Sequence, residues 1–404
     1  MLNSELTLIH LFENSCCLSI QGLSRFQIKK MFAMDLIRLV LHGVLHPFSI
    51  PRILWSNLSR FCERKLPTKR LENKVIIITG ANSGLGEALA HICYELGSYV
   101  VLCGRKYDEL YRVKNELLAK NLNCQTHEPM VLVLDLTKLT EIPDKVNEVF
   151  ETYGHVDVLI NNAGIGYRGE IVSTKLETDI RLMVTNYFGQ VALTKAVLPY
   201  MQICNSGSIV AVSSIQGRIS IPYRSAYSAS KHALQAFFDC LRSEVEKDRI
   251  HVCVVSPGYI RTNLSCNALT GSGKNYGSKK RVFLHQVRLY DVTNFPSSNM
   301  MQYDGRHRLG HVIGPRDKLM DPTTASGMEP RHVAFEIIKA VILKKKEIIL
   351  SPFSNKIALL IRSIIPSLYF YVMSLRASKL KIDSEDHENT GGDTDLVNSL
   401  PGIN

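Results

Sequence analysis

Short aliphatic runs alternate with amphipathic stretches along the middle of the chain. The aliphatic runs are rich in β-branched residues, which is typical of strands buried on both faces of a sheet. Helical spacing of apolar residues is clearest at 107–120, 178–201 and 227–245. The alternation predicts an α/β fold, a single domain with a Rossmann-type, doubly wound parallel sheet and helices on both faces. Six strands are predicted, at residues 75–78, 99–103, 131–134, 156–160, 208–212 and 250–255.

A glycine-rich turn follows the first predicted strand and precedes a helical stretch that starts at Glu87. Its sequence is Thr79-Gly80-Ala81-Asn82-Ser83-Gly84-Leu85-Gly86. Glycines allow a backbone to turn tightly and to approach a pyrophosphate at the N-terminus of a helix. The spacing is Gly-x-x-x-Gly-x-Gly rather than Gly-x-Gly-x-x-Gly, and a purely structural turn is the alternative. The order strand, turn, helix favours dinucleotide binding.

Acid–base chemistry is indicated by Tyr227 and Lys231, which lie four residues apart in the run Tyr-Ser-Ala-Ser-Lys. Positions i and i+4 share one face of a helix, so the ammonium of Lys231 can lie beside the phenol of Tyr227. A neighbouring cation favours phenolate and moves the phenol pKa from about 10 toward neutrality. Ser214, thirteen residues before Tyr227, can donate a hydrogen bond to an oxygen that gains negative charge. A surface ion-pair helix is the alternative for the Tyr/Lys pair alone.

Together these motifs resemble the short-chain dehydrogenase/reductase family, in its compact form. The resemblance covers about residues 74–279 and resumes near Met320. Longer strings, such as Thr185-Asn186-Tyr187-Phe188-Gly189, are most similar to the member 7 branch of that family, a group of membrane-associated oxidoreductases. The residues that carry the resemblance are the glycine-rich turn, Asp135, Asn161 to Gly164, Asn186, Ser214, Tyr227, Lys231 and Pro257-Gly258.

The resemblance implies a role for each catalytic candidate. Tyr227 would be the general acid in reduction and the base in oxidation, and Lys231 would lower its pKa and bind the nicotinamide ribose. Ser214 would polarise the substrate carbonyl, with Ser213 as the alternative, and Asn186 would hold a water near Lys231. Besides Tyr227 and Lys231, the implied cofactor contacts are Thr79, Gly80, Asn82, Ser83, Gly84, Leu85, Gly86, Asp135, Leu136, Asn162, Ala163, Gly164, Pro257, Gly258, Ile260 and Thr262.

The end of the second predicted strand bears on the choice of cofactor. NAD enzymes usually have a carboxylate there, hydrogen-bonded to the ribose 2′-hydroxyl. Here the strand ends Leu-Cys-Gly and continues with Arg105 and Lys106. The planar guanidinium of Arg105 suits a 2′-phosphate, so NADP(H) is favoured over NAD(H). The alternative is that both residues are solvated loop cations.

The chain of 404 residues carries 48 Lys and Arg against 37 Asp and Glu, a net charge of +11. We expect no nucleic-acid partner, because aromatic-interleaved basic motifs and zinc-ligand spacing are both lacking; no metal site is expected either. Bases near 52–70 adjoin an apolar stretch and fit an anionic membrane surface. The ten cysteines contain no Cys-x-x-Cys and are interpreted as reduced thiols.

Several segments flank or interrupt the predicted catalytic domain. The stretch 34–56 is apolar but contains charges and two prolines, so it is predicted to be a membrane anchor, spanning or interfacial. Residues 1–33 and 280–319 are either true segments of the protein or the product of a misassigned exon boundary in the gene. The predicted organisation is an N-terminal extension (1–33), anchor (34–56), basic linker (57–73), catalytic domain (74–352) with an atypical insertion (280–319), hydrophobic C-terminal helix (353–381) and polar disordered tail (382–404).

From the sequence we expect an NADP(H)-dependent enzyme that interconverts a carbonyl and an alcohol by hydride transfer with a Ser-Tyr-Lys relay. A lipophilic substrate such as a steroid, retinoid or lipid ketone follows from the expected membrane surface. The expected location is an intracellular membrane, the endoplasmic reticulum or alternatively the peroxisome, with the catalytic domain in the cytosol. A homodimer is compatible with the resemblance. The alternative function is a non-catalytic NADP-binding interaction or sensor protein on the same fold.

Overall fold

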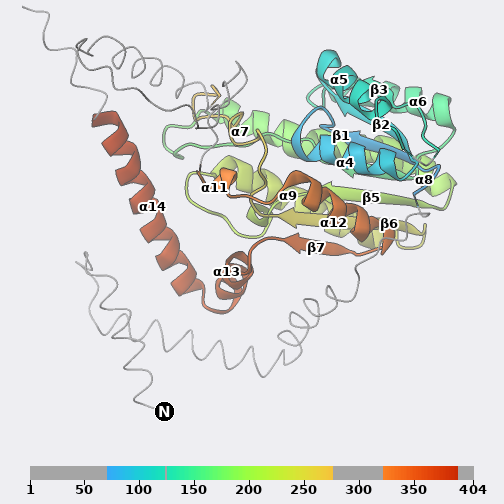
Figure 1. The fold of residues 1–404 in the computed structure, drawn as a ribbon. Coiled ribbons are helices and arrows are strands. Elements are labelled where there is room, and N and C mark those ends of the chain that lie inside the picture. Colours follow the sequence, from blue (N-terminus) through green and yellow to red (C-terminus); the bar gives the residue numbers. More distant parts are fainter. Residues whose placement is uncertain (1–70, 123–124, 276–321, 390–404) are drawn as a thin grey trace, which may run out of the picture. The chain divides into compact units, whose positions relative to one another are not determined.

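A parallel sheet of seven strands is the centre of the fold (Figure 1). The structure, a computed structural model, describes residues 71–122, 125–275 and 322–389. The strand order is β3-β2-β1-β4-β5-β6-β7, and every neighbouring pair is parallel. The strands are β1 (Val75–Thr79), β2 (Tyr99–Gly104), β3 (Met130–Val133), β4 (Val158–Asn161), β5 (Gly207–Val212), β6 (Ile250–Pro257) and β7 (Glu347–Leu350).

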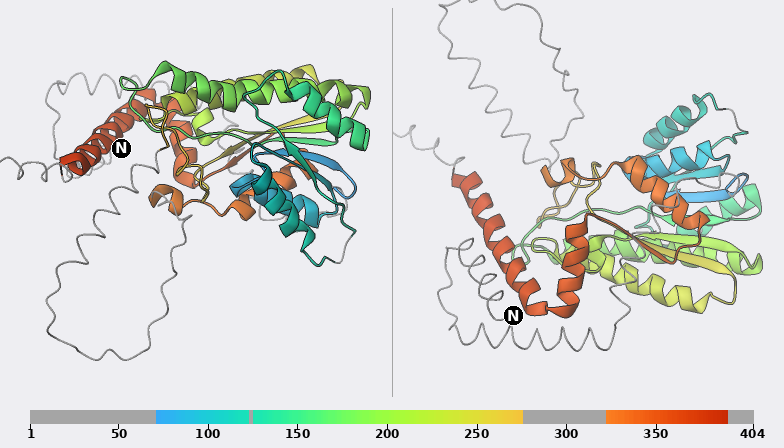
Figure 2. Two further views of the ribbon diagram at one scale, coloured as in Figure 1. Left: turned by 90° about the horizontal axis from the view of Figure 1, so that it is seen from above. Right: turned by 60° about the horizontal axis from the view of Figure 1, so that its bottom comes forward.

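Helices cover both faces of this sheet (Figure 2). Successive side chains of a strand point to opposite faces, so Ile76 and Ile78 pack on one apolar layer and Val75 and Ile77 on the other. The first layer is completed by α4 (Gly84–Glu95), α5 (Tyr107–Leu118) and α12 (Pro330–Ile342). The second is completed by α6 (Ile142–Tyr153), α8 (Gly189–Ile203) and α9 (Ser225–Glu244).

The order of the strands fixes where a ligand can bind. Strand β1 pairs with β2 on one side and with β4 on the other, so the chain reverses its direction of travel across the sheet at this point. Open α/β sheets bind ligands outside the carboxyl ends of the strands at such a switch point. The glycine-rich turn after β1 therefore lies where the fold places a dinucleotide.

The predicted doubly wound sheet is confirmed, and each of the six predicted strands is present. Five elements of the described residues were not predicted: α6, α12, the edge strand β7, the 3₁₀ turn η3 (Ile215–Gly217) and the short helix α11 (Pro322–Ala325). The predicted helix 178–201 is three consecutive segments, namely α7 (Leu176–Met183), a π-helical turn η2 (Val184–Phe188) and α8. Such π turns are frequent at functional sites, and Asn186 lies inside this one.

The C-terminal hydrophobic stretch differs from the single predicted helix 353–381. It forms α13 (Phe353–Ile364) and α14 (Pro366–Asn389), because a proline has no N–H to donate and disfavours helical backbone in the residue before it. Helix α14 continues to Asn389, past the predicted helix end at 381, and the predicted disorder of the tail 382–404 stays a prediction. Extending an existing helix gains one hydrogen bond per added residue and needs no new nucleation.

None of the helices that the structure describes is both long enough and apolar enough to cross a membrane. The predicted extension 1–33, the anchor 34–56, most of the linker 57–73, the insertion 280–319 and the end of the tail lie outside the described residues.

Candidate active site

A cavity of about 550 Å³ opens at the carboxyl ends of the strands. Its lining brings together Ser214, Tyr227 and Lys231 with the predicted cofactor residues from five loops. Of all residues predicted for the site, Gly86 and Asn186 are the two that do not line the cavity. Gly86 and Asn186 are both buried behind the cavity wall, where each supports the structure of the site.

The glycine-rich turn is fixed by hydrogen bonds from the end of β4. The hydroxyl oxygen of Thr79 accepts hydrogen bonds from the backbone N–H groups of Asn162 and Ala163, both at 2.9 Å. The Asn162 side chain donates in turn to the carbonyl oxygen of Thr79 at 2.8 Å. Thr79 and Asn162 therefore join the two strands at the switch point and hold the turn against the sheet.

Gly80 and Gly86 of the turn each exclude a larger residue, for different physical reasons. Gly80 has a φ of +67°, a left-handed conformation that side chains disfavour. Gly86 faces the turn from α4, and a Cβ there would overlap the carbonyl oxygen of Gly80 and lie 2.7 Å from Nδ2 of Asn162. Gly86 thus permits the close packing of α4 on the turn, and it does not line the cavity.

The N-terminus of α4 is directed at the cavity. Ser83 occupies the N-cap position, but its side chain makes no capping hydrogen bond, and Ser83, Gly84 and Leu85 all line the cavity. The first N–H groups of a helix have no partner within the helix, and they carry the positive end of its dipole. This arrangement suits a pyrophosphate.

Tyr227 and Lys231 project from the first two turns of α9. Lys231 is 3% exposed, and its Nζ donates a hydrogen bond of 2.9 Å to the carbonyl oxygen of Val212 at the end of β5. Its Nζ lies 5.9 Å from the centre of the Tyr227 ring. Burial disfavours the charged form and lowers the pKa of Lys231 to about 8.

The structure distinguishes the two serines that follow β5. The hydroxyl of Ser213 donates to the carbonyl oxygen of Lys231 at 3.2 Å, so its proton is used inside the protein. The Ser214 oxygen accepts a hydrogen bond from the N–H of Gln216 at 3.1 Å, and Ser214 lines the cavity together with Tyr227. The geometry therefore favours Ser214 over Ser213 as the partner of a substrate oxygen.

The pKa of Tyr227 shifts in the direction opposite to the sequence expectation. Burial raises the pKa of the Tyr227 phenol, while the Ser214 side chain and the charge of Arg224 act against the rise. The sequence expectation took account of the Lys231 cation but not of the desolvation of the phenol. In this structure desolvation is the largest single effect on the Tyr227 pKa. Tyr227 is accordingly protonated at neutral pH, which is the form of a general acid.

Asn186 in the π turn η2 holds the backbone beside Lys231. Its Nδ2 donates to the carbonyl oxygen of Ile165 and to the hydroxyl of Ser230, each at 3.0 Å, and its Oδ1 accepts from the N–H of Ile165 at 2.8 Å. Both amide hydrogens are therefore used within the protein. The implied role of Asn186 in holding a water stays a prediction.

The loop after β2, for which the sequence predicts a role in cofactor choice, lines the cavity. Arg105 and Lys106 are exposed and line the cavity. Asp135 after β3 lines the same cavity, and its Oδ1 accepts hydrogen bonds from the N–H and the hydroxyl of Thr137 at 3.0 and 2.9 Å. This Asx turn orients Asp135 at the cavity wall.

Sequence reasoning missed the residues that close the outer part of the cavity. They come from two irregular loops that are bridged at Tyr167 and Leu269, where the Arg168 N–H donates to the Leu269 carbonyl oxygen at 2.8 Å. No hydrophobic period marks these loops, so no sequence signal could have paired them. The missed lining residues of these loops include Tyr167, Arg168 and Leu269, and Arg181 of α7, Gln216 after β5 and Arg224 before α9 also line the cavity.

Comparison with known proteins agrees with the fold. The family described as short chain dehydrogenase matches residues 74–271. A "Dehydrogenase/reductase SDR family protein 7-like" of Anopheles gambiae is 43% identical over 334 residues, covering 83% of this chain and 92% of that protein. The chain belongs to the short-chain dehydrogenase/reductase family of oxidoreductases.

Within the family, the chain is similar to proteins named dehydrogenase/reductase SDR family member 7B. The one from Bos taurus is 40% identical over 361 residues, covering 89% of this chain and 96% of that protein. The predicted resemblance to the member 7 branch is thereby confirmed.

Solved structures show the same fold. A short-chain dehydrogenase from Streptomyces avermitilis has a TM-score of 0.53 and 25% identity, covering 80% of this chain and 98% of that one. A short chain dehydrogenase/reductase from Burkholderia phymatum in complex with NAD has a TM-score of 0.53 at 21% identity, covering 78% and 96%. This is a fold that binds a nicotinamide cofactor.

Proposed function

We propose that the protein is an NADP(H)-dependent oxidoreductase that interconverts a carbonyl and an alcohol with Ser214, Tyr227 and Lys231. One observation carries this proposal. The side chains of Ser214, Tyr227 and Lys231 line one cavity together with the glycine-rich turn. The residues present fit the cofactor, because the turn and the N-terminus of α4 offer backbone donors to a pyrophosphate.

The chemistry divides between the cofactor and the chain. A bound nicotinamide supplies or accepts the hydride. In the direction of reduction, Ser214 would donate a hydrogen bond to the substrate oxygen, and Tyr227 would transfer its proton to that oxygen as the hydride reaches carbon. Lys231, one helical turn away, would stabilise the phenolate that Tyr227 becomes. Oxidation reverses each transfer.

Exchange of Arg105 for alanine is expected to weaken NADPH binding by about 10- to 100-fold and to leave NADH binding within about threefold of the wild type. A charged hydrogen bond to a 2′-phosphate contributes on the order of 1.5–3 kcal/mol, and NADH lacks that phosphate. Fluorescence titration with NADPH and with NADH measures the loss of affinity of the variant for each cofactor. Equal losses for NADPH and NADH would contradict the preference for NADP(H).

NADPH affinity is expected to fall as the pH rises through about 8. Lys231 has its pKa lowered to about 8, so it is a cation below that pH and neutral above it, where its attraction to the cofactor is lost. The unfolded chain retains this proton up to about 10.4, so between these values the folded chain binds fewer protons and the group's contribution to stability increases with pH. NADPH titration of the wild type at a series of pH values measures this fall in affinity. The NADPH affinity of Lys231→Met should not change between pH 7 and 9.5. A fall of the same size in the variant would assign the pH dependence to another group.

We further propose a lipophilic carbonyl or alcohol substrate and a membrane surface as the chain's partners, at the endoplasmic reticulum or alternatively at peroxisomes. The support is the apolar stretch 34–56 beside a basic segment. Fractionation of cells that produce the tagged chain, with and without residues 1–56, tests the location. The proposal fails if the full chain stays in the soluble fraction.

The decisive assay follows NADPH absorbance with the purified chain and a panel of steroid, retinoid and lipid carbonyls. Parallel reactions contain NADH. Turnover with NADPH supports the enzyme and its cofactor together. NADPH binding without turnover of any carbonyl would favour the non-catalytic binding protein instead.

A further inference from the structure

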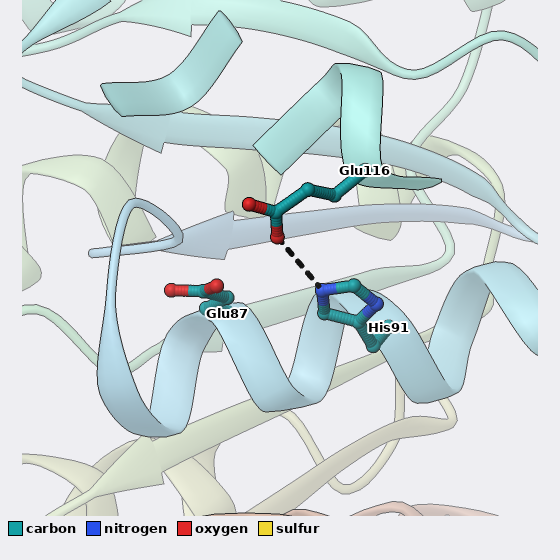
Figure 3. A group of neighbouring side chains, drawn as sticks. All are labelled: Glu87, His91 and Glu116. Atoms are coloured by element: carbon teal, nitrogen blue, oxygen red, sulfur yellow. Dashed lines mark ion pairs between the residues drawn. The ribbon is translucent and has the colours of Figure 1, made fainter. Parts of the chain in front are cut away.

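A charged network joins α4 to α5 beside the glycine-rich turn (Figure 3). Glu87 and His91 lie on α4, and Glu116 reaches toward them from α5, with His91 Nε2 at 3.9 Å from its carboxylate. At the centre of the network is Arg112 on α5. Its Nη1 and Nη2 each lie 3.0 Å from a different carboxylate oxygen of Glu87, and Nη1 is 2.7 Å from Glu116.

The same guanidinium reaches the cofactor turn. Nη2 of Arg112 donates a hydrogen bond of 3.2 Å to the backbone carbonyl oxygen of Asn82, a residue of the glycine-rich turn that lines the cavity. The turn is also tightly packed at this position, because a Cβ on Gly104 would lie 3.1 Å from Oδ1 of Asn82. Arg112 is thus attached to the turn without lining the cavity.

Glu87 presents an electrostatic conflict for a cofactor site. It lies in the first turn of α4, the helix whose N-terminus is directed at the cavity. A carboxylate at that position is favourable for the helix dipole of the empty protein, but it repels a pyrophosphate brought to the same helix end. Its side chain is 23% exposed, so water screens the charge incompletely. The fork of Arg112 cancels this charge with a bidentate pair.

A metal site is the competing interpretation of the network. Glu87, His91 and Glu116 each offer a ligand atom, and these atoms lie within 4.8 Å of one another. Both carboxylates already accept hydrogen bonds from Arg112, and a divalent cation would have to displace that guanidinium. No second observation on the described residues points to an ion there.

We propose that Arg112 is a positioning residue for the cofactor, which neutralises Glu87 and holds the glycine-rich turn through the Asn82 carbonyl. This proposal rests on the proposed function, since it requires a nicotinamide dinucleotide at the turn. Arg112 contacts neither the substrate nor the reacting atoms. Its effect is therefore on cofactor affinity and the Michaelis constant for NADPH, with kcat at saturating NADPH maintained.

A charge-deletion series tests the proposal on the purified full chain, with NADPH as the probe. Arg112→Gln leaves Glu87 uncompensated and is expected to weaken NADPH binding by about 10- to 100-fold, the range for a charged hydrogen-bonded group. Adding Glu87→Gln removes the repelling charge and is expected to restore affinity to within about threefold of the wild type. Glu87→Gln alone should bind NADPH at least as tightly as the wild type.

Lys114→Gln is the matched control, because it removes another cation of α5 that pairs with the exposed Glu128 and does not contact the turn. Its NADPH affinity should equal that of the wild type. Thermal unfolding of each variant identifies any loss of fold. Unchanged binding by Arg112→Gln, or a loss that Glu87→Gln does not restore, would overturn the proposal. If the wild type binds neither NADPH nor NADH, the proposed function itself fails, and the inference fails with it.

Discussion

Exchange of Tyr227 for phenylalanine is expected to lower kcat for carbonyl reduction by about 10²- to 10⁴-fold, the contribution of a positioned general acid. The substitution removes only the hydroxyl of a residue that lines the cavity together with Ser214. The ring and its packing remain, so NADPH should bind within about threefold of the wild-type affinity. Stopped-flow or steady-state NADPH absorbance, with cofactor titration in parallel, measures both quantities.

Tyr200→Phe provides the control for the loss of a tyrosine hydroxyl. That hydroxyl donates to Asn147 at 2.6 Å on the helical surface and lies outside the cavity lining. The Tyr200→Phe variant should retain the kcat of the wild type. Retention of activity in Tyr227→Phe would remove Tyr227 from the mechanism, and an equal loss in Tyr200→Phe would show that the loss does not depend on the site.

Exchange of Gly86 for alanine should abolish NADPH binding and lower the free energy of unfolding by about 3 kcal/mol or more, the upper range for overpacking. The added Cβ would overlap the carbonyl oxygen of Gly80 and approach Nδ2 of Asn162 at 2.7 Å. These atoms belong to a backbone turn and to a side chain that bonds Thr79, so neither can move cheaply. Relief of the overlap would displace α4 from the turn.

Gly154→Ala is the matched control for this prediction. Gly154 ends α6 with a φ of +73°, but nothing lies within 4 Å of a Cβ placed there. The expected cost is the about 1–2 kcal/mol of a left-handed alanine, with NADPH binding unchanged. Urea unfolding and NADPH titration of both variants separate the two effects. If Gly86→Ala bound NADPH normally, the close approach of α4 to the turn would not be required for the cofactor site.

The sequence alone predicted the elements whose chemistry is local. Aliphatic runs such as 75–78 indicate buried strands because each residue there needs an apolar surrounding on its own face. The glycine-rich turn follows β1 directly, and Tyr227 and Lys231 share a helical face because of their spacing. All three features depend on residues within one or two turns of each other, so they can be recognised without knowledge of the fold.

The short edge strand β7 and the break at Pro366 are intermediate cases. Four residues such as Glu347–Leu350 are too few for a periodicity to be diagnostic, and their pairing with β6 depends on residues about 93 positions earlier in the chain. Pro366 was visible in the sequence, but a proline can kink a helix or end it. The packing around it decides between these outcomes.

Tertiary structure alone decided the states of the catalytic candidates. Ser213 and Ser214 are chemically identical neighbours, and the difference between them is that the Ser213 hydroxyl donates to the carbonyl oxygen of Lys231, while the Ser214 oxygen accepts from the N–H of Gln216. The pKa of Tyr227 is raised because burial disfavours phenolate, an effect for which the spacing of Lys231 gives no information. Hydrogen-bond partners and desolvation depend on segments far apart in sequence, so local patterns indicated the candidate catalytic groups, and the packing of the whole domain determined their protonation and orientation.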